Sequence, residues 1–281
     1  MTTLDEGQVR IVGHASGTPG LAQRLMRSSL LKAIASPLLV LVIWEIAVRC
    51  GLLDSRFFPA PSSVFAELFR LLQSGELLGD LGWTTQRVAI GFLLGAIPGI
   101  LLGLALGLSP LLNAFLLPII GAIYPVPKIA LFPLVMMFFG LGETSKWAIV
   151  AIAVFFQVFF STLAGVVNID PIYLDVAKNF GAGRWQTYRS IALPAAMPYV
   201  LTGCQLGLGM ALIVVVVAEQ FGTKNGLGFL IWRSWQIFEV RDMFVGLMSV
   251  ALLGSVLQFL MIRLEHMLVR WKSRPNPLSL V

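Results

Sequence analysis

The chain alternates long apolar runs with short polar segments. No Asp, Glu, Lys or Arg occurs at residues 88–127, 147–169, 190–218 or 243–262. Each of these runs is long enough for a helix that crosses a hydrocarbon core, which takes about 20 residues. The pattern predicts an all-α integral membrane protein with about six transmembrane helices, near residues 31–48, 83–108, 112–139, 146–167, 195–219 and 243–263.

Three segments depart from the pattern of a plain span. The third predicted span contains Pro118, Pro125, Pro127 and Pro133, so we expect a kinked or discontinuous helix there. Residues 64–72 carry apolar side chains at a helical period, which predicts a helix lying on the membrane surface. Residues 227–238 include Trp232 and Trp235, and because Trp favours the membrane boundary we expect a re-entrant or interfacial helix.

The composition excludes a soluble enzyme and a disordered chain. The 281 residues are 57% hydrophobic and 12% charged, whereas soluble proteins carry about 25% charged residues. Cys50 and Cys204 make no disulfide framework or zinc cluster, and His14 and His266 lie outside the apolar runs, so no metal site is expected. The net charge of +6 has no soluble basic domain to carry it, so we expect contact with membrane lipid and no nucleic-acid partner.

The basic residues predict the orientation of the chain. Placing both termini inside, N-in and C-in, leaves more basic than acidic residues in the cytoplasmic segments. Residues 1–28 then form a cytoplasmic tail, with an uncleaved first span after it because no small-residue cleavage site follows the apolar run. Residues 29–270 form the transmembrane domain, with a cytoplasmic loop at 168–194, and residues 271–281 form a second cytoplasmic tail.

The second predicted span has a glycine at every fourth position. These glycines are Gly91, Gly95, Gly99, Gly103 and Gly107. Glycine at this spacing clears one ridge of a helix over about 24 Å, so that another helix can approach it backbone to backbone. We expect tight helix packing, inside the subunit or across a dimer. A pore-lining role is the alternative.

Ionisable residues at membrane depth are candidates for function. Glu45 and Arg87 fall at similar depths in adjacent predicted helices, so we expect a structural ion pair. Lys128 follows two prolines in the broken third span, near Tyr124, where a lysine can attract an anionic substrate; snorkelling, or pairing with a carboxylate such as Glu219, is the alternative. Further candidate pathway or gate residues are Tyr124, Gln157, Glu219 and Gln220.

The predicted cytoplasmic loop has a helix–glycine–helix pattern. A helix is expected from Pro171, broken at Gly181-Ala182-Gly183, and followed by a short helix over 185–191 that runs into Pro194. Such a pattern on the cytoplasmic face is suited to docking into a groove of a soluble partner.

This loop resembles the EAA loop of binding-protein-dependent ABC importer permeases. The residues on that motif's spacing are Asp175, Ala177, Gly181, Ile191, Leu193 and Pro194. Asp175 and Val176 stand where the motif has Glu and Ala. Residues 124–133, 139–146, 218–220 and 226–231 are similar to the nitrate, taurine and aliphatic-sulfonate branch, which is itself similar to permeases for bicarbonate and vitamin-related heterocycles. Lys128 stands where members of that branch often have a second proline.

The resemblance implies a type I ABC importer permease in a bacterial cytoplasmic (inner) membrane. It implies a second copy of the permease, two ABC ATPase subunits coupled through residues 171–194, and a periplasmic or lipid-anchored substrate-binding protein. ATP and Mg would be used by the partner ATPase, since this chain has no Gly-x-x-x-x-Gly-Lys-Ser/Thr motif and no cofactor is expected in it. The expected substrate is a small organic or inorganic anion, such as a sulfonate, taurine or nitrate.

Other functions stay open at this point. The same type of importer could carry a vitamin-related heterocycle or bicarbonate. A gradient-driven secondary transporter would need coupling carboxylates at mid-depth, where the chain offers only Glu45 and Glu219, both near the predicted outer side. An intramembrane enzyme is disfavoured, because neither His-Glu-x-x-His nor Gly-x-Ser-x-Gly is present.

Overall fold

The computed structural model describes residues 29–269, and within them the regular elements are helices, with no strand. The all-α fold is therefore confirmed. The chain divides into two units, Met1–Pro61 and Ser62–Val281, which are described separately. The two predicted tails, 1–28 and 271–281, lie outside the described residues. The N-in, C-in orientation and the dimer stay predictions.

The first unit is built around one apolar helix. This helix, α2 (Ser29–Arg49), has 21 residues and covers the first predicted span. Several of its large apolar side chains are exposed, including Leu39, Val40 and Ile43, as expected for a surface that meets lipid. A turn follows in which Arg56 pairs with Asp54 at 2.8 Å.

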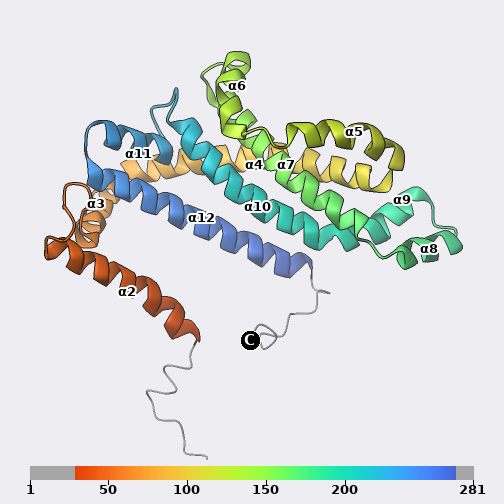
Figure 1. Ribbon diagram of the computed structural model, residues 1–281, viewed down its shortest axis with the longest axis horizontal. Helices are drawn as coiled ribbons and strands as arrows, with labels where there is room; N and C mark the ends of the chain where they lie inside the picture. Colours follow the sequence, from red (N-terminus) through yellow and green to blue (C-terminus); the bar gives the residue numbers. More distant parts are fainter. Residues whose placement is uncertain (1–28, 270–281) are drawn as a thin grey trace, which may run out of the picture. The chain divides into compact units, whose positions relative to one another are not determined.

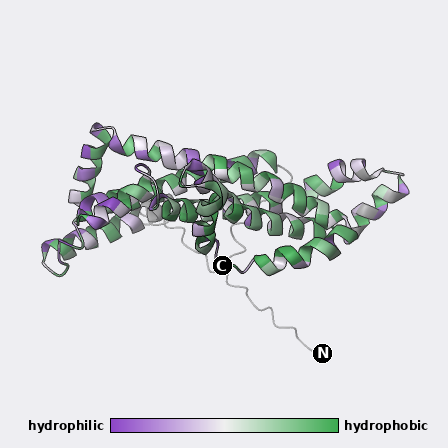
Figure 2. Cartoon of the chain, turned by 90° about the horizontal axis from the view of Figure 1, so that it is seen from above, coloured by the Kyte–Doolittle hydropathy of each residue, from purple (hydrophilic) through white to green (hydrophobic). Residues whose placement is uncertain are grey.

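The second unit holds the remaining helices (Figure 1). They are α3 (Pro61–Gln73), α4 (Glu76–Leu108), α5 (Pro110–Ile123), η1 (Lys128–Leu131), α6 (Phe132–Phe139), α7 (Glu143–Val167), α8 (Pro171–Asn179), α9 (Arg184–Thr187), η2 (Tyr188–Ala192), α10 (Leu193–Glu219), α11 (Leu227–Gln236) and α12 (Val240–Leu268). Four described segments are long and apolar enough to cross a membrane, namely Glu76–Leu108, Glu143–Val167, Trp185–Glu219 and Val240–Leu268. Figure 2 shows that hydrophobic residues predominate over the long helices of the chain.

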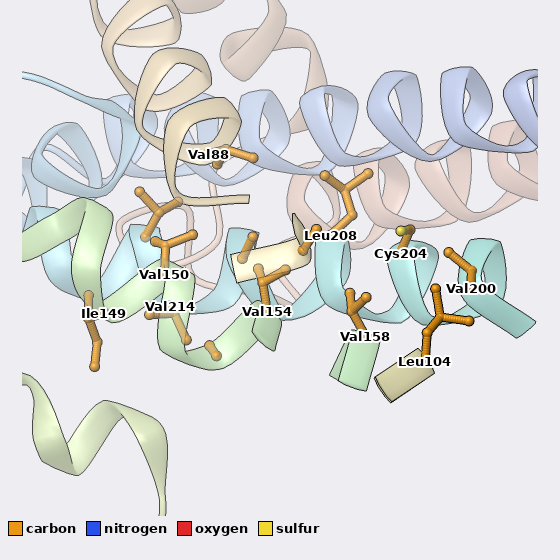
Figure 3. Packing of buried hydrophobic residues seen from close by; sticks show 14 of the residues in the cluster. Val88, Leu104, Ile149, Val150, Val154, Val158, Val200, Cys204, Leu208 and Val214 are labelled. Carbon is orange, nitrogen blue, oxygen red and sulfur yellow. The ribbon is translucent and has the colours of Figure 1, made fainter. Parts of the chain in front are cut away.

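Helix α7 lies at the centre of this unit, between α4 and α10. The five glycines spaced four residues apart, Gly91 to Gly107, all face it: a Cβ at Gly95 would lie 2.3 Å from the Ala151 carbonyl oxygen, and one at Gly107 would lie 2.5 Å from the Val166 Cβ. On the other side of α7, Gly203 of α10 lies against Ser161. Valines of α7 and apolar residues of α10 fill the space between these helices (Figure 3). The glycine ridge therefore packs α4 on α7 inside the subunit, which is one of the expected arrangements and not the pore-lining one.

The third predicted span is discontinuous, as its prolines indicated. Helix α5 and the segment Lys128–Phe139 meet at an angle of 87°. Helices α4 and α7 run in the same direction, because Gly91 faces Val150 while Gly107 faces Val166. The bent pair must therefore return the chain from the end of α4 to the start of α7, which is the path of a broken span.

The fifth predicted span begins earlier than expected. Residues Trp185–Glu219 form one 35-residue helical segment, so Pro194 does not separate a short helix from the span. The physical reason is a π-helical stretch, Tyr188–Ala192, which leads into α10 with Pro194 in its first turn. A proline has no backbone N–H to donate, and this position and the widened turn before it accommodate that loss.

The amphipathic segment near residue 64 is a separate helix, α3, with apolar side chains on two faces. Val64 and Leu71 are buried in a cluster with Leu227 of α11 and Val245 of α12. Phe65 and Phe69 are exposed, at 46% and 62%. The buried face fixes α3 to the second unit, and the exposed face is suited to lipid contact.

Candidate functional site

A buried arginine joins three helices at one end of the bundle. Arg87 of α4 has no exposed side-chain surface. Its Nε and Nη2 donate to the two carboxylate oxygens of Glu143 on α7, at 2.7 and 2.8 Å. Its Nη1 donates to Glu219 Oε1 on α10 at 2.8 Å and to the Asn225 carbonyl oxygen at 2.9 Å. This fork geometry satisfies the guanidinium and ties α4 to the first residue of α7 and the last residue of α10.

The same network caps the N-terminus of α11. The backbone N–H of Gly226 donates to Asp80 Oδ1 at 2.7 Å, and that of Leu227 donates to Thr84 Oγ1 at 2.8 Å. The N–H of Gly228 donates to Glu219 Oε2 at 2.8 Å. These groups have no partner inside their own helix, so side chains of α4 and α10 supply the acceptors. The segment predicted as re-entrant or interfacial is thus a short helix fixed by buried polar contacts.

The expected Glu45–Arg87 pair is replaced by other contacts. Arg87 binds Glu143 and Glu219, while Glu45 pairs with Arg49 one helical turn further along α2. The membrane depth expected from the sequence pointed to Glu45 as the partner of Arg87. Two other carboxylates lie at the same end of the bundle as Arg87, because Glu143 begins α7 and Glu219 ends α10. Glu219, expected along the pathway, is fully buried as a partner of this arginine, and Gln220 is the residue that caps α10.

Sequence reasoning missed Asp80, Thr84 and Glu143 as members of this network. Glu143 could have been predicted from the sequence. It lies just before the start of the fourth predicted span, at the same expected membrane depth as Glu219 at the end of the fifth. Thr84 had none, since a single hydroxyl at a helix start is common. Its role depends on the return of α11, which only the fold shows.

Lys128 lies at the bend between α5 and α6, as the first residue of η1. Its Nζ donates to the Tyr124 carbonyl oxygen, and it lies 4.8 Å from the Tyr124 ring centroid and 4.5 Å from that of Phe156. Tyr124 also packs edge-on against Phe160, with 4.6 Å between centroids. Gln157 follows Phe156 on α7 and is half-buried. The structure therefore brings Lys128, Tyr124 and the α7 aromatics together, away from the contacts of Arg87.

The predicted coupling loop presents apolar side chains to its surroundings. Phe180 is 86% exposed and Trp185 is 71% exposed, and Ile172, Tyr173 and Val176 are also exposed. Gly181 has φ +67° between α8 and α9, a left-handed conformation that favours glycine.

The motif residues in this loop hold its shape. Ala177 is buried, and its carbonyl oxygen accepts from the Ala182 N–H at 2.9 Å. Ile191 and Leu193 pack against the main core. Asp175 lies on the exposed part of α8, and Pro194 lies in the first turn of α10.

Comparison with known proteins assigns the family. Residues 99–274 match the family described as "Binding-protein-dependent transport system inner membrane component". The chain is 31% identical over 243 residues to the putative aliphatic sulfonates transport permease protein SsuC of Bacillus subtilis (strain 168), covering 86% of this chain and 88% of the relative. It is 30% identical over 244 residues to the taurine transport system permease protein TauC of Escherichia coli (strain K12), covering 85% and 89%.

A third relative agrees with these two. The chain is 31% identical over 235 residues to the putative aliphatic sulfonates transport permease protein SsuC of Escherichia coli (strain K12), covering 84% of this chain and 89% of the relative. With its membrane-length helices and discontinuous span, the chain belongs to the family of binding-protein-dependent transport system inner membrane components and is a multi-pass inner-membrane permease of an ABC transporter.

Proposed function

We propose that this chain is the permease subunit of an ATP-driven importer for small organic anions of the sulfonate type. Two copies would form the translocation pathway, and two ABC ATPase subunits would bind below them and use ATP and Mg. A periplasmic or lipid-anchored binding protein would deliver the substrate. The chain itself would not be an enzyme.

The observation that carries the coupling proposal is the exposed apolar surface of the α8–α9 loop. Most of the side-chain surface of Phe180 and Trp185 is exposed in this loop. Exposed aromatic side chains in a polar-flanked loop mark a protein-binding surface. An ATPase groove that accepts this helix–glycine–helix segment would cover them.

The same loop has a direct mechanical connection to the opposite end of the subunit. Trp185 begins the 35-residue helical segment that ends at Glu219, a length of about 52 Å. Glu219 is bound by Arg87, so a displacement of the loop by closing ATPases would reach the α4–α7–α11 network through one continuous element. This supports rocking of helices as a unit, the usual form of alternating access.

The substrate proposal is supported by the names of the relatives. Relatives at 30 and 31% identity are named for taurine and aliphatic sulfonates. Bicarbonate and vitamin-related heterocycles are the alternatives from the same branch. Uptake assays with the reconstituted complex separate these substrate classes, since an importer of sulfonates should accumulate labelled taurine or alkanesulfonate and leave labelled bicarbonate outside.

Two matched tryptophans test the docking surface. Trp185 stacks on Tyr188 with 5.4 Å between centroids, and Trp235 packs on Trp232 at 5.0 Å, with 56% of Trp235 exposed. We expect Trp185→Ala to weaken binding of the co-purifying ATPase by about 30-fold, as for an interface hot spot, and Trp235→Ala to leave it unchanged. Equal binding by both variants would contradict docking at this loop.

A further inference from the structure

The bend between α5 and α6 places a cation where a membrane-spanning segment is interrupted. Lys128 follows Pro127 and opens the 3₁₀ turn that carries the chain through the 87° change of direction. A cationic side chain within a spanning segment is unfavourable unless it is paired, hydrated or used. The contacts of this lysine therefore decide what it does.

The ammonium of Lys128 is only partly satisfied. An ammonium has three N–H donors, and one of them reaches the Tyr124 carbonyl oxygen. In the part of the chain that the structure describes, no carboxylate forms an ion pair with Lys128, whereas Arg87 has two such partners. Two donors and a full positive charge are thus available to an anion from outside the chain.

The surroundings of this ammonium are aromatic. The Tyr124 ring is 4.8 Å and the Phe156 ring 4.5 Å from Nζ, and Phe160 supports Tyr124 from the side. Tyr124 is 41% exposed, so its surface is open to a ligand. A cation beside apolar ring surfaces is matched by a molecule with an anionic head and a carbon substituent. Nitrate, sulfate or bicarbonate would use the cation and leave the rings without a partner.

We propose that Lys128, Tyr124 and Phe156 form a binding site for an organic anion. Lys128 would bind the anionic oxygens and the exposed Tyr124 ring would lie along the substituent, while the Phe156 ring, which is only 6% exposed, would support the ammonium from the α7 side. This inference rests on the proposed function in taking the transported solute to be an anion, and it goes further by naming the residues that select an organic anion over an inorganic one.

Charge-selective labelling beside Lys128 tests the site. Ile129 is the next residue and is 39% exposed, so Ile129→Cys places a thiol next to the site in a Cys50→Ser background that removes the exposed native thiol. The full-length permease in nanodiscs is labelled with two thiosulfonate reagents of similar size, one bearing ethylsulfonate and the other ethyltrimethylammonium. The ratio of their rates reports the local charge.

With Lys128 intact, we expect the anionic-to-cationic rate ratio to be about tenfold higher than in Lys128→Met, from the Coulomb energy of one nearby charge. Lys128→Arg should retain most of this ratio. Phe180→Cys provides the matched control, because its ratio should not change with Lys128→Met. We also expect 1-pentanesulfonate to slow labelling of Ile129→Cys more strongly than sulfate at the same concentration.

Three results would overturn the proposal. The rate ratio could be the same with and without Lys128, the thiol could be unreactive toward both reagents, or sulfate could protect it as well as pentanesulfonate. The assay needs neither ATPase nor binding protein. Its failure would therefore leave the coupling proposal intact, and failure of the Trp185→Ala test would leave this one intact.

Discussion

Replacing one glycine of α4 by alanine should distinguish the effect of helix packing on stability from the effect of helix propensity. In Gly95→Ala the new Cβ would lie 2.3 Å from the Ala151 carbonyl oxygen and 2.9 Å from the Val154 Cβ. The first of these atoms belongs to the backbone of α7 and cannot rotate away, so α4 and α7 must move apart. Gly82→Ala lies on the same helix, and its Cβ would meet nothing within 4 Å.

The two substitutions change helix propensity equally and packing very differently. Alanine is favoured over glycine in a helix by about 1 kcal/mol, so Gly82→Ala should be neutral or stabilising by up to that amount. Overpacking a close contact costs about 1–3 kcal/mol, and Gly95→Ala has a backbone atom as the obstacle, so we expect the upper part of that range. Because the propensity change cancels, the difference between the variants should be about 2–3 kcal/mol.

The difference in stability between the two variants is measured by thermal unfolding in mild detergent. The readout is the loss of the monodisperse peak in size-exclusion chromatography. For a chain of this size, about 2–3 kcal/mol corresponds to a midpoint difference of roughly 4–12 °C. Gly95→Ala should unfold at the lower temperature. If the two variants unfold together, the α4–α7 contact is not held by the glycine ridge, and the packing argument is refuted.

Three further outcomes follow from the buried network and can be read in the same unfolding assay. Arg87→Met should destabilise the permease by about 3–5 kcal/mol, because it leaves two carboxylates without their partner; an unchanged midpoint would contradict the network. Glu219→Gln should destabilise more than Glu143→Gln, since the Glu219 side chain is 0% exposed and that of Glu143 is 34% exposed; the reverse order would contradict the assignment. Gly226→Ala should lower the midpoint more than Gly222→Ala: both glycines have a positive φ, +111° and +67°, but a Cβ at Gly226 would lie 2.5 Å from Glu219, whereas one at Gly222 would have contacts of 3.4 Å; equal shifts would argue against a close approach at α11.

Apolar periodicity and glycine spacing were enough to predict most of the fold. Spans 83–108 and 146–167 lie within α4 and α7, and the prolines of the third span located its break. These features follow from local rules, because a spanning helix must satisfy its own backbone and a proline cannot. The predicted start of the fifth span, residue 195, lies close to the start of α10 at Leu193, but its continuity with the preceding short helix was not predicted, because a π-helical stretch is not visible in residue type alone.

The charged contacts could not be predicted in the same way. Pairing Glu45 with Arg87 assumed that neighbours in sequence are neighbours in the bundle. Arg87 instead binds residues 56 and 132 positions further along the chain. Such partners depend on how α7 and α10 are arranged around α4, and on the return of α11 into the same region. The membrane depth expected from the sequence limits which carboxylates could pair with Arg87, and the packing of the helices decides which of them do.

Native mass spectrometry of the tagged chain, extracted from its own membrane in mild detergent, tests the central claim most directly. We expect an assembly with two copies of this permease and two copies of an ABC ATPase. Trp185→Ala should lose the ATPase under the same extraction, while Trp235→Ala should retain it. Recovery of the unmodified chain alone or as a simple oligomer, with no ATPase under gentle extraction, would contradict the account and favour a gradient-driven transporter.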